Sequence, residues 1–538
     1  MRLKSLLTSL EQPPLRLVGA SAKRSGARIN TSRPSPIYRP SAALTDDFEI
    51  TELAYDSRQV QAGGLFIAVP GFHTDGQRFL ADAAQRGALV ALGEALPPAA
   101  QTSLPLPYIE VQNVRVALAN LACAFYGYPA DQLCTIGVTG TDGKTTTSNL
   151  ISAIFEVAGF QTGLMTTANF RISGQEWENA TRQSTLEALE VQQHLRRMRE
   201  AGVTHAIIEA TSHGLELQRV RGCNFDVGVV TNITHEHLDF HKTLEQYHRA
   251  KARLFAMLDP TRDKGLGIHP VAILNRDDTS YEVLKPYCRV PILDYGIAQA
   301  ASVRAVDIQL EAHSTRFRVL LPQTELMIET HLVGRFNVSN CLAAIATAHS
   351  QGIRPADIAQ GLAQVQGVTG RMENINEGQP FTVIVDYAHT PDSLEKVLAT
   401  LRPLTSGKLM LVFGSAGERD VQKRPLMGRI AAQMTDFFVI TDEDPREEDR
   451  TRILQEIANG AETVGKKQGS DYLCIADRSE AIATAFARAQ AGDTILLAGK
   501  GHEQSIIIGR QKLPWDDRQV AREELRRLHS SASNKGTP

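Results

Sequence analysis

The chain has 538 residues, 42% of them hydrophobic, and a formal net charge of −3. This length exceeds what one hydrophobic core supports, so we expect three domains. The near-zero charge excludes a protein that is steered as a whole to nucleic acid or to a membrane surface, and no apolar run is long enough to span a bilayer. Its 40 glycines are typical of an α/β protein, in which many strands turn directly into helices.

The cysteines are scattered along the chain and include no C-x-x-C pair; they are Cys123, Cys134, Cys223, Cys288, Cys341 and Cys474. This spacing favours reduced thiols over a disulfide framework or a zinc site. Residues 1–10 are too short and too weakly apolar for a secretory signal peptide. We therefore expect a cytoplasmic protein.

The N-terminal region begins with the pattern of a short amphipathic helix at 1–12, and 13–45 is expected to be a disordered loop. Within that loop, 21–43 contains one lysine and several arginines, prolines and serines, but no acidic residue. Such a composition cannot bury a core, and a solvated linker fits it better than a basic interaction tail.

A small α/β unit follows from Ile50. Strands are expected at 64–68 and 88–92, with a helix at 79–86 between them. Ser57 lies in a loop of this unit, where a serine alone is an ordinary polar residue.

A glycine-rich loop at 140–146 joins an expected buried strand at 134–138 to an expected helix at 148–157. Strand, glycine turn and helix with Gly-Lys-Thr at the turn form a phosphate-binding loop, because the glycines let backbone N–H groups face a phosphate at the helix N-terminus. Lys144 then reaches the β- and γ-phosphates, and Thr145 holds Mg²⁺. A tight turn without a ligand is the alternative, but the strand-turn-helix context favours nucleotide binding.

Two strands downstream end in polar side chains. The strand expected at 204–208 is followed by Glu209, and the strand expected at 226–230 leads to His235 and His237. Ligands of parallel sheets sit at the carboxyl ends of strands, so Glu209 and His237 are expected near the phosphate loop as ligands of a nucleotide-bound metal, although Mg²⁺ prefers oxygen. A zinc site at the two histidines lacks a third ligand at suitable spacing, and loop polarity is the remaining alternative.

Two helical positions also stand out. Lys251 lies in an expected helix at 247–255, where a solvated lysine is the ordinary alternative to a functional one. Asn337 is expected to cap a helix at 338–348 and to contact a base.

A third α/β unit begins near residue 370. Its four expected strands each end in a polar cluster; the clusters are 386–391, 414–420, 441–446 and 498–503. So many polar strand ends in one sheet indicate a binding site.

Taken together, these residues resemble the Mur ligases of peptidoglycan synthesis. The resemblance covers nearly the whole chain, apart from 13–45 and the tail after Ser530. Its motifs are specific; they are G-T-x-G-K-T-T (140–146), G-R-F-N (334–337), D-Y-A-H-T-P (386–391), K-R-P-x-M-G (423–428) and G-K-G-H-E (499–503).

The resemblance implies an α/β protein of three domains. An N-terminal domain at 1–119 would bind the UDP moiety, a central phosphate-loop ATPase would span 120–366, and a C-terminal Rossmann-like domain at 367–530 would bind an amino acid. Residues 531–538 are expected to be a disordered tail.

The implied activity is an ATP-dependent amide ligation with Mg²⁺ as cofactor. A substrate carboxylate attacks the γ-phosphate to give an acyl phosphate, and an incoming amine then displaces phosphate. The resemblance implies that a diamino acid is added to UDP-MurNAc-L-Ala-D-Glu in the cytoplasm, by a monomer, in the synthesis of cell-wall precursors.

Family roles carry over to matching positions. The implied catalytic residues are Lys144, Glu209, His237 and Lys251. The implied ATP-binding residues are Gly140, Thr141, Asp142, Gly143, Lys144, Thr145, Thr146, Asn337 and Arg371. The implied metal ligands are Thr145, Glu209, His237 and a carbamate on Lys251, which turns a cation into an oxygen anion. The implied UDP-substrate residues are Ser57, Ser184, Thr185, Ser212 and Arg219.

The amino acid is implied to bind at Arg419, Glu443, Asp444, Arg446, Gly499 and Glu503. Arg419 suits an α-carboxylate, and Asp444 and Glu503 suit a side-chain amine. Arg446 suits the second carboxylate of meso-diaminopimelate, which is therefore favoured. However, residues 443–446 read Glu-Asp-Pro-Arg where diaminopimelate-adding relatives usually read Asp-Asn-Pro-Arg. If Asp442, Glu447 or Glu448 neutralises Arg446, the acidic pocket would instead suit L-ornithine or L-lysine.

Other positions depart from the family pattern. Val138 stands where the usual phosphate loop has its first glycine, and Asp142 replaces an asparagine. The segment at 184–186 reads Ser-Thr-Leu instead of Thr-Thr-Pro. At 217–219 the chain reads Leu-Gln-Arg instead of Gln-Gly-Arg.

Two other functions remain open from the sequence. Folylpolyglutamate synthetases share the phosphate loop and the acyl-phosphate chemistry, but the N-terminal unit and the G-K-G-H-E segment argue against them. A catalytically inactive, nucleotide-gated binding protein is the non-enzymatic alternative, and the presence of Lys144, Glu209, His237 and Lys251 argues against it.

Overall fold

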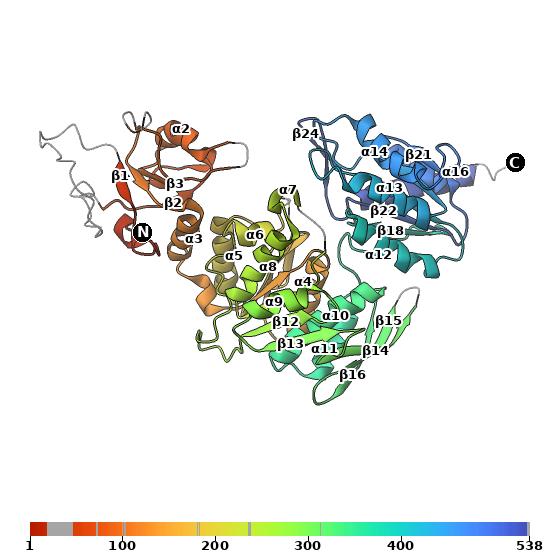
Figure 1. Ribbon diagram of the computed structural model, residues 1–538, viewed down its shortest axis with the longest axis horizontal. Helices are drawn as coiled ribbons and strands as arrows, with labels where there is room; N and C mark the ends of the chain where they lie inside the picture. Colours follow the sequence, from red (N-terminus) through yellow and green to blue (C-terminus); the bar gives the residue numbers. More distant parts are fainter. Residues whose placement is uncertain are drawn as a thin grey trace, which may run out of the picture.

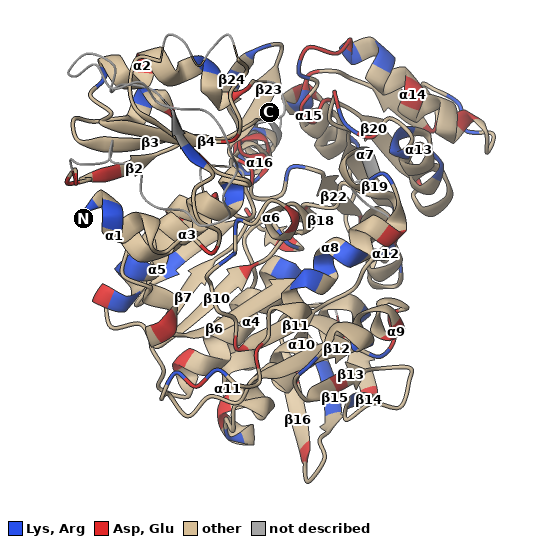
Figure 2. Cartoon of the chain, turned by 60° about the vertical axis from the view of Figure 1, so that its left-hand side comes forward, with Lys and Arg blue, Asp and Glu red and all other residues tan. Residues whose placement is uncertain are grey.

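A computed structural model describes residues 1–18, 47–71, 74–98, 101, 104–179, 181, 183–234, 238–311 and 314–534. Each of three separate β-sheets, in the N-terminal, central and C-terminal parts of the chain, is covered by helices (Figure 1). In this view the N-terminal and C-terminal parts lie on either side, above the central part. The three-part α/β organisation expected from the sequence is confirmed, whereas the exact domain bounds stay a prediction. Acidic and basic residues are spread over all three parts (Figure 2), in keeping with the net charge of −3.

The N-terminal sheet has the strand order β1-β5-β4-β3-β2. Its strands are β1 (Arg16–Val18), β2 (Glu52–Ala54), β3 (Gly64–Ala68), β4 (Val90–Gly93) and β5 (Tyr108–Glu110). Its helices are α1 (Leu3–Leu7), η1 (Ser57–Gln59), η2 (Gly76–Phe79), α2 (Leu80–Gln85), α3 (Val114–Phe125) and η4 (Pro129–Gln132). All strand pairs are parallel except β1 with β5.

The expected loop at 13–45 differs from the structure at its start. Residues Arg16–Val18 pair antiparallel with β5, and Arg16 Nε lies 2.7 Å from Glu110 Oε2. The expectation for 21–43 concerns residues outside the described part of the chain. At the other end, α16 (Asp517–Asn534) extends the fold into the expected tail.

The central sheet has the strand order β16-β15-β14-β13-β12-β11-β6-β10-β7-β8-β9. Its strands are β6 (Cys134–Thr139), β7 (Thr162–Met165), β8 (Asn169–Ile172), β9 (Gln175–Glu178), β10 (His205–Glu209), β11 (Val227–Val230), β12 (Val271–Asn275), β13 (Ile292–Gly296), β14 (Val303–Leu310), β15 (Thr315–Leu320) and β16 (Glu325–Thr330). The seven neighbouring strands from β14 to β7 pair in parallel, and the hairpins at both edges are antiparallel.

Helices cover both faces of the central sheet; they are α4 (Lys144–Val157), α5 (Ala188–Glu200), α6 (Ser212–Glu216), α7 (Leu238–His241), α8 (Leu244–Ala256), α9 (Ser280–Leu284), η5 (Lys285–Tyr287), α10 (Arg335–Ser350) and α11 (Pro355–Gln364). One buried cluster joins β6 to α4, α10 and α11, and a second joins the sheet to α5 and α8. Because β6 lies between β11 and β10 inside the parallel region, the loop that follows it opens at the sheet's carboxyl edge, away from both ends of the sheet.

The C-terminal sheet has the strand order β17-β18-β22-β19-β20-β21, parallel except for β17. Its strands are β17 (Glu373–Ile375), β18 (Thr382–Asp386), β19 (Leu409–Phe413), β20 (Phe437–Ile440), β21 (Tyr472–Cys474) and β22 (Thr494–Ala498), followed by the hairpin β23 (Ser505–Ile508) and β24 (Gln511–Pro514). Its helices are α12 (Pro391–Leu401), η6 (Arg402–Leu404), α13 (Lys423–Met434), α14 (Arg450–Glu462), α15 (Arg478–Arg488) and α16. The four polar clusters expected from the sequence thus leave one parallel sheet at its carboxyl edge.

Within the described residues, no helix combines the length and the apolar composition that crossing a membrane requires.

Candidate functional site

The loop after β6 has a backbone shape that only glycine permits at two positions. Gly140 and Gly143 have φ angles of +147° and +82°. A Cβ atom at Gly140 would lie 1.8 Å from Thr231 Oγ1, and one at Gly143 would lie 2.3 Å from Asn340 Oδ1. The loop is also held by Asn232, whose carbonyl accepts the Thr141 N–H at 2.8 Å. A preformed loop of this kind presents backbone N–H groups at the N-terminus of α4.

Lys144 and Thr145 stand at the first turn of α4, as expected for a phosphate-binding loop. The Lys144 ammonium donates to the carbonyls of Gly140 at 3.1 Å and Thr141 at 2.7 Å, so it is folded over its own loop. Thr145 is buried, and its hydroxyl lies 3.5 Å from Arg371 Nη2. A bound phosphate would compete with the two carbonyls for the ammonium.

A cavity of about 260 Å³ lies between this loop and the C-terminal sheet. Its lining residues are Asp142, Gly143, Thr145, Thr146, Asn232, Asn275, Asp277, Asp278, Leu332, Phe336, Asn337, Ser339, Asn340, Val368, Arg371, Met372, Asp386, Tyr387, Ala388, His389, Ser393, Lys396 and Val397. Both predicted nucleotide contacts outside the loop, Asn337 and Arg371, line it. The Arg371 guanidinium lies 4.5 Å from the centre of the Tyr387 ring. The cavity therefore brings central and C-terminal residues to the same phosphate loop.

Asn337 is not the helix cap that the sequence suggested. Helix α10 begins at Arg335, and Gly334, with φ +108°, is its N-cap. Asn337 is buried in the first turn, where its Nδ2 donates to Val333 O at 2.9 Å and its Oδ1 accepts from Asn340 at 3.1 Å. Because Gly334 caps the helix, α10 begins three residues before the start that was expected from Asn337 as the cap.

Glu209 ends β10 beside the phosphate loop, in register with Val138 of β6. Its side chain is fully buried, and Thr167 donates to both of its oxygens, from N–H at 3.2 Å and from Oγ1 at 2.7 Å. The prediction for His237 concerns a residue outside the described part of the chain. Thr145 and Glu209 offer oxygen donors of the kind that Mg²⁺ prefers, so these residues fit the metal of a Mg-nucleotide.

Lys251 is buried, so the alternative interpretation of it as a solvated lysine on the helix surface is wrong. It is 1% exposed on α8, and its Nζ donates to Gly140 O at 2.6 Å and lies 4.5 Å from the centre of the Tyr247 ring. Tyr247 Oη in turn lies 3.0 Å from Thr141 Oγ1. This helix therefore brings a lysine directly against the backbone of the phosphate loop.

Three of the predicted UDP-substrate residues lie together beside Glu209. Thr185 Oγ1 donates to the Glu209 carbonyl at 2.8 Å, and Arg219 Nη1 donates to the Thr185 carbonyl at 3.1 Å. Ser212 is buried, and its hydroxyl has no hydrogen-bond partner among the described residues. Ser184 precedes Thr185 and is half-buried.

Ser57 lies at the start of η1 in the N-terminal part, where its hydroxyl hydrogen-bonds Asp82 and thereby lowers the pKa of that carboxyl. One link between the N-terminal and central parts is an ion-pair cluster that the sequence did not predict. Glu187 lies 2.5 Å from Arg219 Nη2 and 3.6 Å from Arg115 Nη1 on α3.

Two of the predicted amino-acid residues, Asp444 and Glu503, contact a buried lysine that the sequence did not predict as part of the site. Lys500 is fully buried, and its Nζ lies 2.9 Å from Asp444 Oδ1 and 2.5 Å from Glu503 Oε2. Gly499 has φ +105°, and a Cβ there would lie 3.4 Å from Glu443 Oε2. Glu443 is itself buried, and that oxygen has no hydrogen-bond partner among the described residues.

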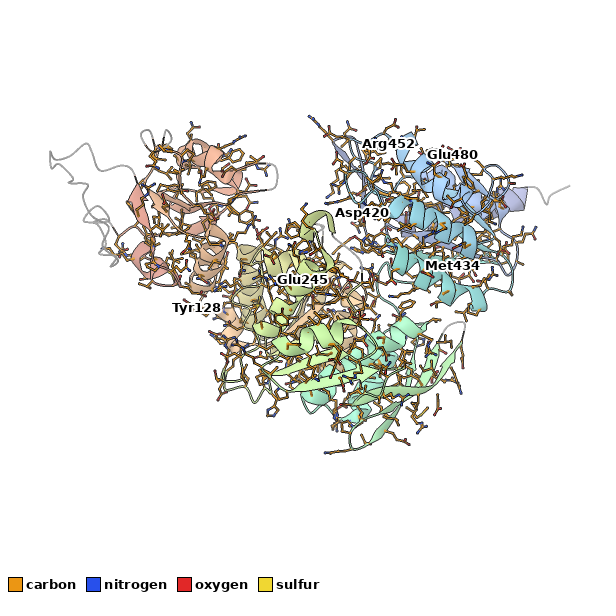
Figure 3. All side chains as sticks on the ribbon, viewed as in Figure 1. Tyr128, Glu245, Asp420, Met434, Arg452 and Glu480 are labelled. Carbon is orange, nitrogen blue, oxygen red and sulfur yellow. The ribbon has the colours of Figure 1, made fainter. Side chains whose placement is uncertain are left out.

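Arg446 is held by its backbone against β23, since its N–H donates to Ile507 O at 3.0 Å. The three acids considered as its internal partners pair with other arginines; the pairs are Asp442 with Arg450, Glu447 with Arg510 and Glu448 with Arg424. Arg419 is exposed in the loop after β19. Asp420, the next residue, lies on the side of the C-terminal part that is turned towards the centre of the molecule (Figure 3).

Three family models match the chain in succession. "Mur ligase family, catalytic domain" matches residues 49–126, "Mur ligase middle domain" matches 138–348, and "Mur ligase, glutamate ligase domain" matches 370–501. The chain belongs to the Mur ligase family.

Relatives agree with this assignment over most of the chain. The chain is 49% identical over 486 residues to the UDP-N-acetylmuramyl-tripeptide synthetase of Roseiflexus sp. (strain RS-1), covering 89% of this chain and 95% of that one. It is 41% identical to the UDP-N-acetylmuramoyl-L-alanyl-D-glutamate–2,6-diaminopimelate ligase of Bacillus velezensis, covering 90% and 96%. A solved structure of a UDP-N-acetylmuramoyl-L-alanyl-D-glutamate–2,6-diaminopimelate ligase is 31% identical, covers 89% of this chain and 95% of that one, and superposes with a TM-score of 0.60.

Sequence reasoning missed several residues that the structure places at the site of this Mur ligase. Lys500 lies inside the G-K-G-H-E motif at 499–503, and this motif could have indicated its place in the site. Asn340 lies one helical turn after Asn337, on the same face of α10. Thr167 and Asn232 gave no such signal, because each acts through a contact with a residue distant in sequence.

Proposed function

We propose that this Mur ligase joins meso-diaminopimelate to UDP-MurNAc-L-Ala-D-Glu while ATP is converted to ADP and phosphate. The observation that carries the proposal is the cavity in which the phosphate loop and α4 face residues 386–397 of the C-terminal part. Such an arrangement suits a reaction in which the central part binds a nucleotide, the C-terminal part binds an amino acid, and the two ligands react between these parts. The names of relatives at 41–49% identity support the choice of substrates.

The proposed reaction has two steps. An oxygen of the substrate carboxylate attacks the γ-phosphorus while the bond to ADP breaks, which gives an acyl phosphate. The amine nitrogen then attacks the acyl carbon, phosphate leaves with the bonding electron pair, and the amine loses a proton. Two anions meet in the first step, so electrostatic stabilisation dominates.

Residues of the central part supply that stabilisation in this proposal. The Lys144 ammonium moves from the carbonyls of its own loop to the transferred phosphoryl group. Bound Mg²⁺ would neutralise charge on the nucleotide, and the oxygens of Thr145 and Glu209 would hold it, with His237 at the position that the family motif assigns.

A carbamate on Lys251 is part of this proposal. A carbamate nitrogen keeps one N–H, so the hydrogen bond to Gly140 O can persist after carboxylation. The new carboxylate would add two oxygens beside the phosphate loop, which suits a second Mg²⁺. Burial of the side chain supports a role other than solvation.

In the C-terminal part, Arg419 is proposed to bind the α-carboxylate of the incoming amino acid, with Glu443, Asp444, Gly499 and Glu503 shaping the pocket. Arg446 is proposed to bind the distal carboxylate.

The UDP-linked substrate is proposed to bind at Ser57, Ser184, Thr185, Ser212 and Arg219. We further propose that the enzyme acts as a monomer in the cytoplasm, where its product enters the synthesis of the cell wall that growth, shape and division require.

The test is phosphate release from ATP by the purified chain. We expect release only when UDP-MurNAc-L-Ala-D-Glu and a diamino acid are both present, with diaminopimelate the best of the amino acids tested. If lysine or ornithine supports faster phosphate release than diaminopimelate, the proposed amino acid is wrong but the proposed reaction stands. Turnover that needs a folate and glutamate, or no turnover at all despite ATP binding, would overturn the proposal.

A further inference from the structure

The carboxylate of Glu209 is held by one residue through two hydrogen bonds. Thr167 lies in the turn between β7 and β8, and its N–H and Oγ1 each donate to a different oxygen of Glu209. Both side chains are buried. Two donors from one residue fix the rotation of the carboxylate plane, and each oxygen keeps a lone pair that can face a cation.

Thr167 also lies beside the C-terminal part. It lines a cavity of about 160 Å³ together with Tyr387 and His502 of that part. Burial lowers the pKa of His502 to about 3, an effect that nearby Arg371 and Arg518 reinforce and that a hydrogen bond with the Thr167 backbone opposes. The contact therefore joins a neutral imidazole of the G-K-G-H-E segment to the residue that orients Glu209.

The position of His502 is fixed by close packing. A Cβ atom on Gly370 would lie 2.1 Å from the His502 nitrogen, and one on Gly501 would lie 2.7 Å from Tyr387 Cβ. The rings of His502 and Tyr387 lie 5.1 Å apart. A shift of the C-terminal part relative to the central sheet would therefore move His502 away from Thr167.

We propose that Thr167 is a positioning residue that orients the Glu209 carboxylate for a metal ion, and that His502 holds Thr167 in place across the two sheets. This inference rests on the proposed function, because it assumes that Glu209 binds the metal. Hydrogen-bond partners of metal ligands commonly change metal affinity by 10–100-fold when they are removed.

The experiment measures Mn²⁺ binding to the full chain in the presence of ADP, by titration of the free-ion signal in electron paramagnetic resonance. Thr167→Val removes the hydroxyl donor and keeps the shape, and we expect its Mn²⁺ dissociation constant to rise roughly 10-fold. Thr167→Ser restores the hydroxyl and should recover most of the affinity. Thermal unfolding checks each fold, and Thr167→Ala replaces Thr167→Val if that variant is unstable.

Three further variants decide how the effect is transmitted. Glu209→Gln should weaken Mn²⁺ binding, and adding Thr167→Val to it should weaken binding no further, because Thr167 acts through Glu209. His502→Phe removes the hydrogen bond but keeps a ring, and it should weaken binding in the same direction as Thr167→Val.

The outcomes separate the two ideas. If Glu209→Gln binds Mn²⁺ as well as the unchanged protein does, the metal role in the proposed function is wrong. If Glu209→Gln weakens binding but Thr167→Val does not, the positioning role is wrong and the metal role stands. If His502→Phe leaves the affinity unchanged, the link across the two sheets is wrong.

Discussion

The Lys500 ammonium and the Asp444 carboxylate form a buried ion pair, with 2.9 Å between Nζ and Oδ1. From the sequence, Asp444 counted as an extra negative charge, because relatives that add diaminopimelate usually have asparagine there. The ion pair neutralises that charge. Since Lys500 also lies 2.5 Å from Glu503, the two acids expected to meet a side-chain amine already share one ammonium. This arrangement lowers the advantage of lysine or ornithine over diaminopimelate.

Arg446 should decide the amino acid. Diaminopimelate carries a distal carboxylate that a guanidinium binds in a bidentate manner, whereas lysine and ornithine lack it. We expect diaminopimelate to have the highest kcat/KM. Arg446→Ala should raise the activation free energy for diaminopimelate by about 2–5 kcal/mol, which lowers its kcat/KM roughly 30-fold or more. The measurement compares kcat/KM for the three amino acids in both proteins.

Arg452 offers a matched control for that substitution. Its side chain is 67% exposed on α14 (Figure 3), so Arg452→Ala should leave the selectivity unchanged. If lysine or ornithine is preferred and Arg446→Ala changes no substrate, the assignment of diaminopimelate is wrong.

Lys144→Ala should abolish ligation and leave the fold intact. The ammonium is held by carbonyls of its own loop, so its loss removes charge stabilisation at the γ-phosphate and not core packing. We expect a loss of several kcal/mol, roughly a thousandfold or more in kcat. Phosphate release and thermal unfolding are measured together, with exposed Lys467→Ala as the control. Near-normal turnover in a folded Lys144→Ala protein would exclude the ATPase role of this loop.

Lys251→Ala should be poorly active and should respond to added carboxylate. If Lys251 acts as a carbamate, a short carboxylate such as acetate supplies the missing oxygens in the space that the side chain leaves. The measurement is phosphate release by Lys251→Ala with and without acetate. Exposed Arg249 on the same helix provides the control, and Arg249→Ala should be active and insensitive to acetate. Normal activity of Lys251→Ala would mean that this lysine only packs against the loop.

Local patterns in the sequence predicted much of this fold, and contacts between distant segments account for what they missed. The strands β19 and β20 end directly before the polar clusters expected at 414–420 and 441–446, because short apolar runs between polar clusters mark buried parallel strands. The pairing of Arg16–Val18 with β5 depends on a partner far along the chain. The same holds at the site. The phosphate loop is a contiguous motif, whereas the contacts of Lys500 with Asp444 and of Thr167 with Glu209 exist only after folding.

Half-buried His205 should make stability depend on pH. Burial lowers the pKa of His205 to about 4 from its ordinary value of 6.5, and its ring packs 4.9 Å from Phe155 and 4.4 Å from Phe160. As the pH falls through about 6.5, the unfolded chain binds a proton on this imidazole while the folded chain stays neutral until about pH 4. The stability is therefore fully present above about pH 6.5 and is lost as the pH falls towards 4.

His205→Phe should remove this part of the pH dependence. Between about pH 7.5 and about pH 5, we expect the variant to lose about 2 kcal/mol less of its free energy of unfolding than the unchanged protein, because phenylalanine binds no proton in either state. The measurement is the apparent thermal midpoint at both pH values. Exposed His269→Phe is the control and should lose as much as the unchanged protein. An equal fall of the midpoint in His205→Phe would show that the acid sensitivity comes from other groups, of which His194, whose pKa burial also lowers to about 4, would be the next to replace.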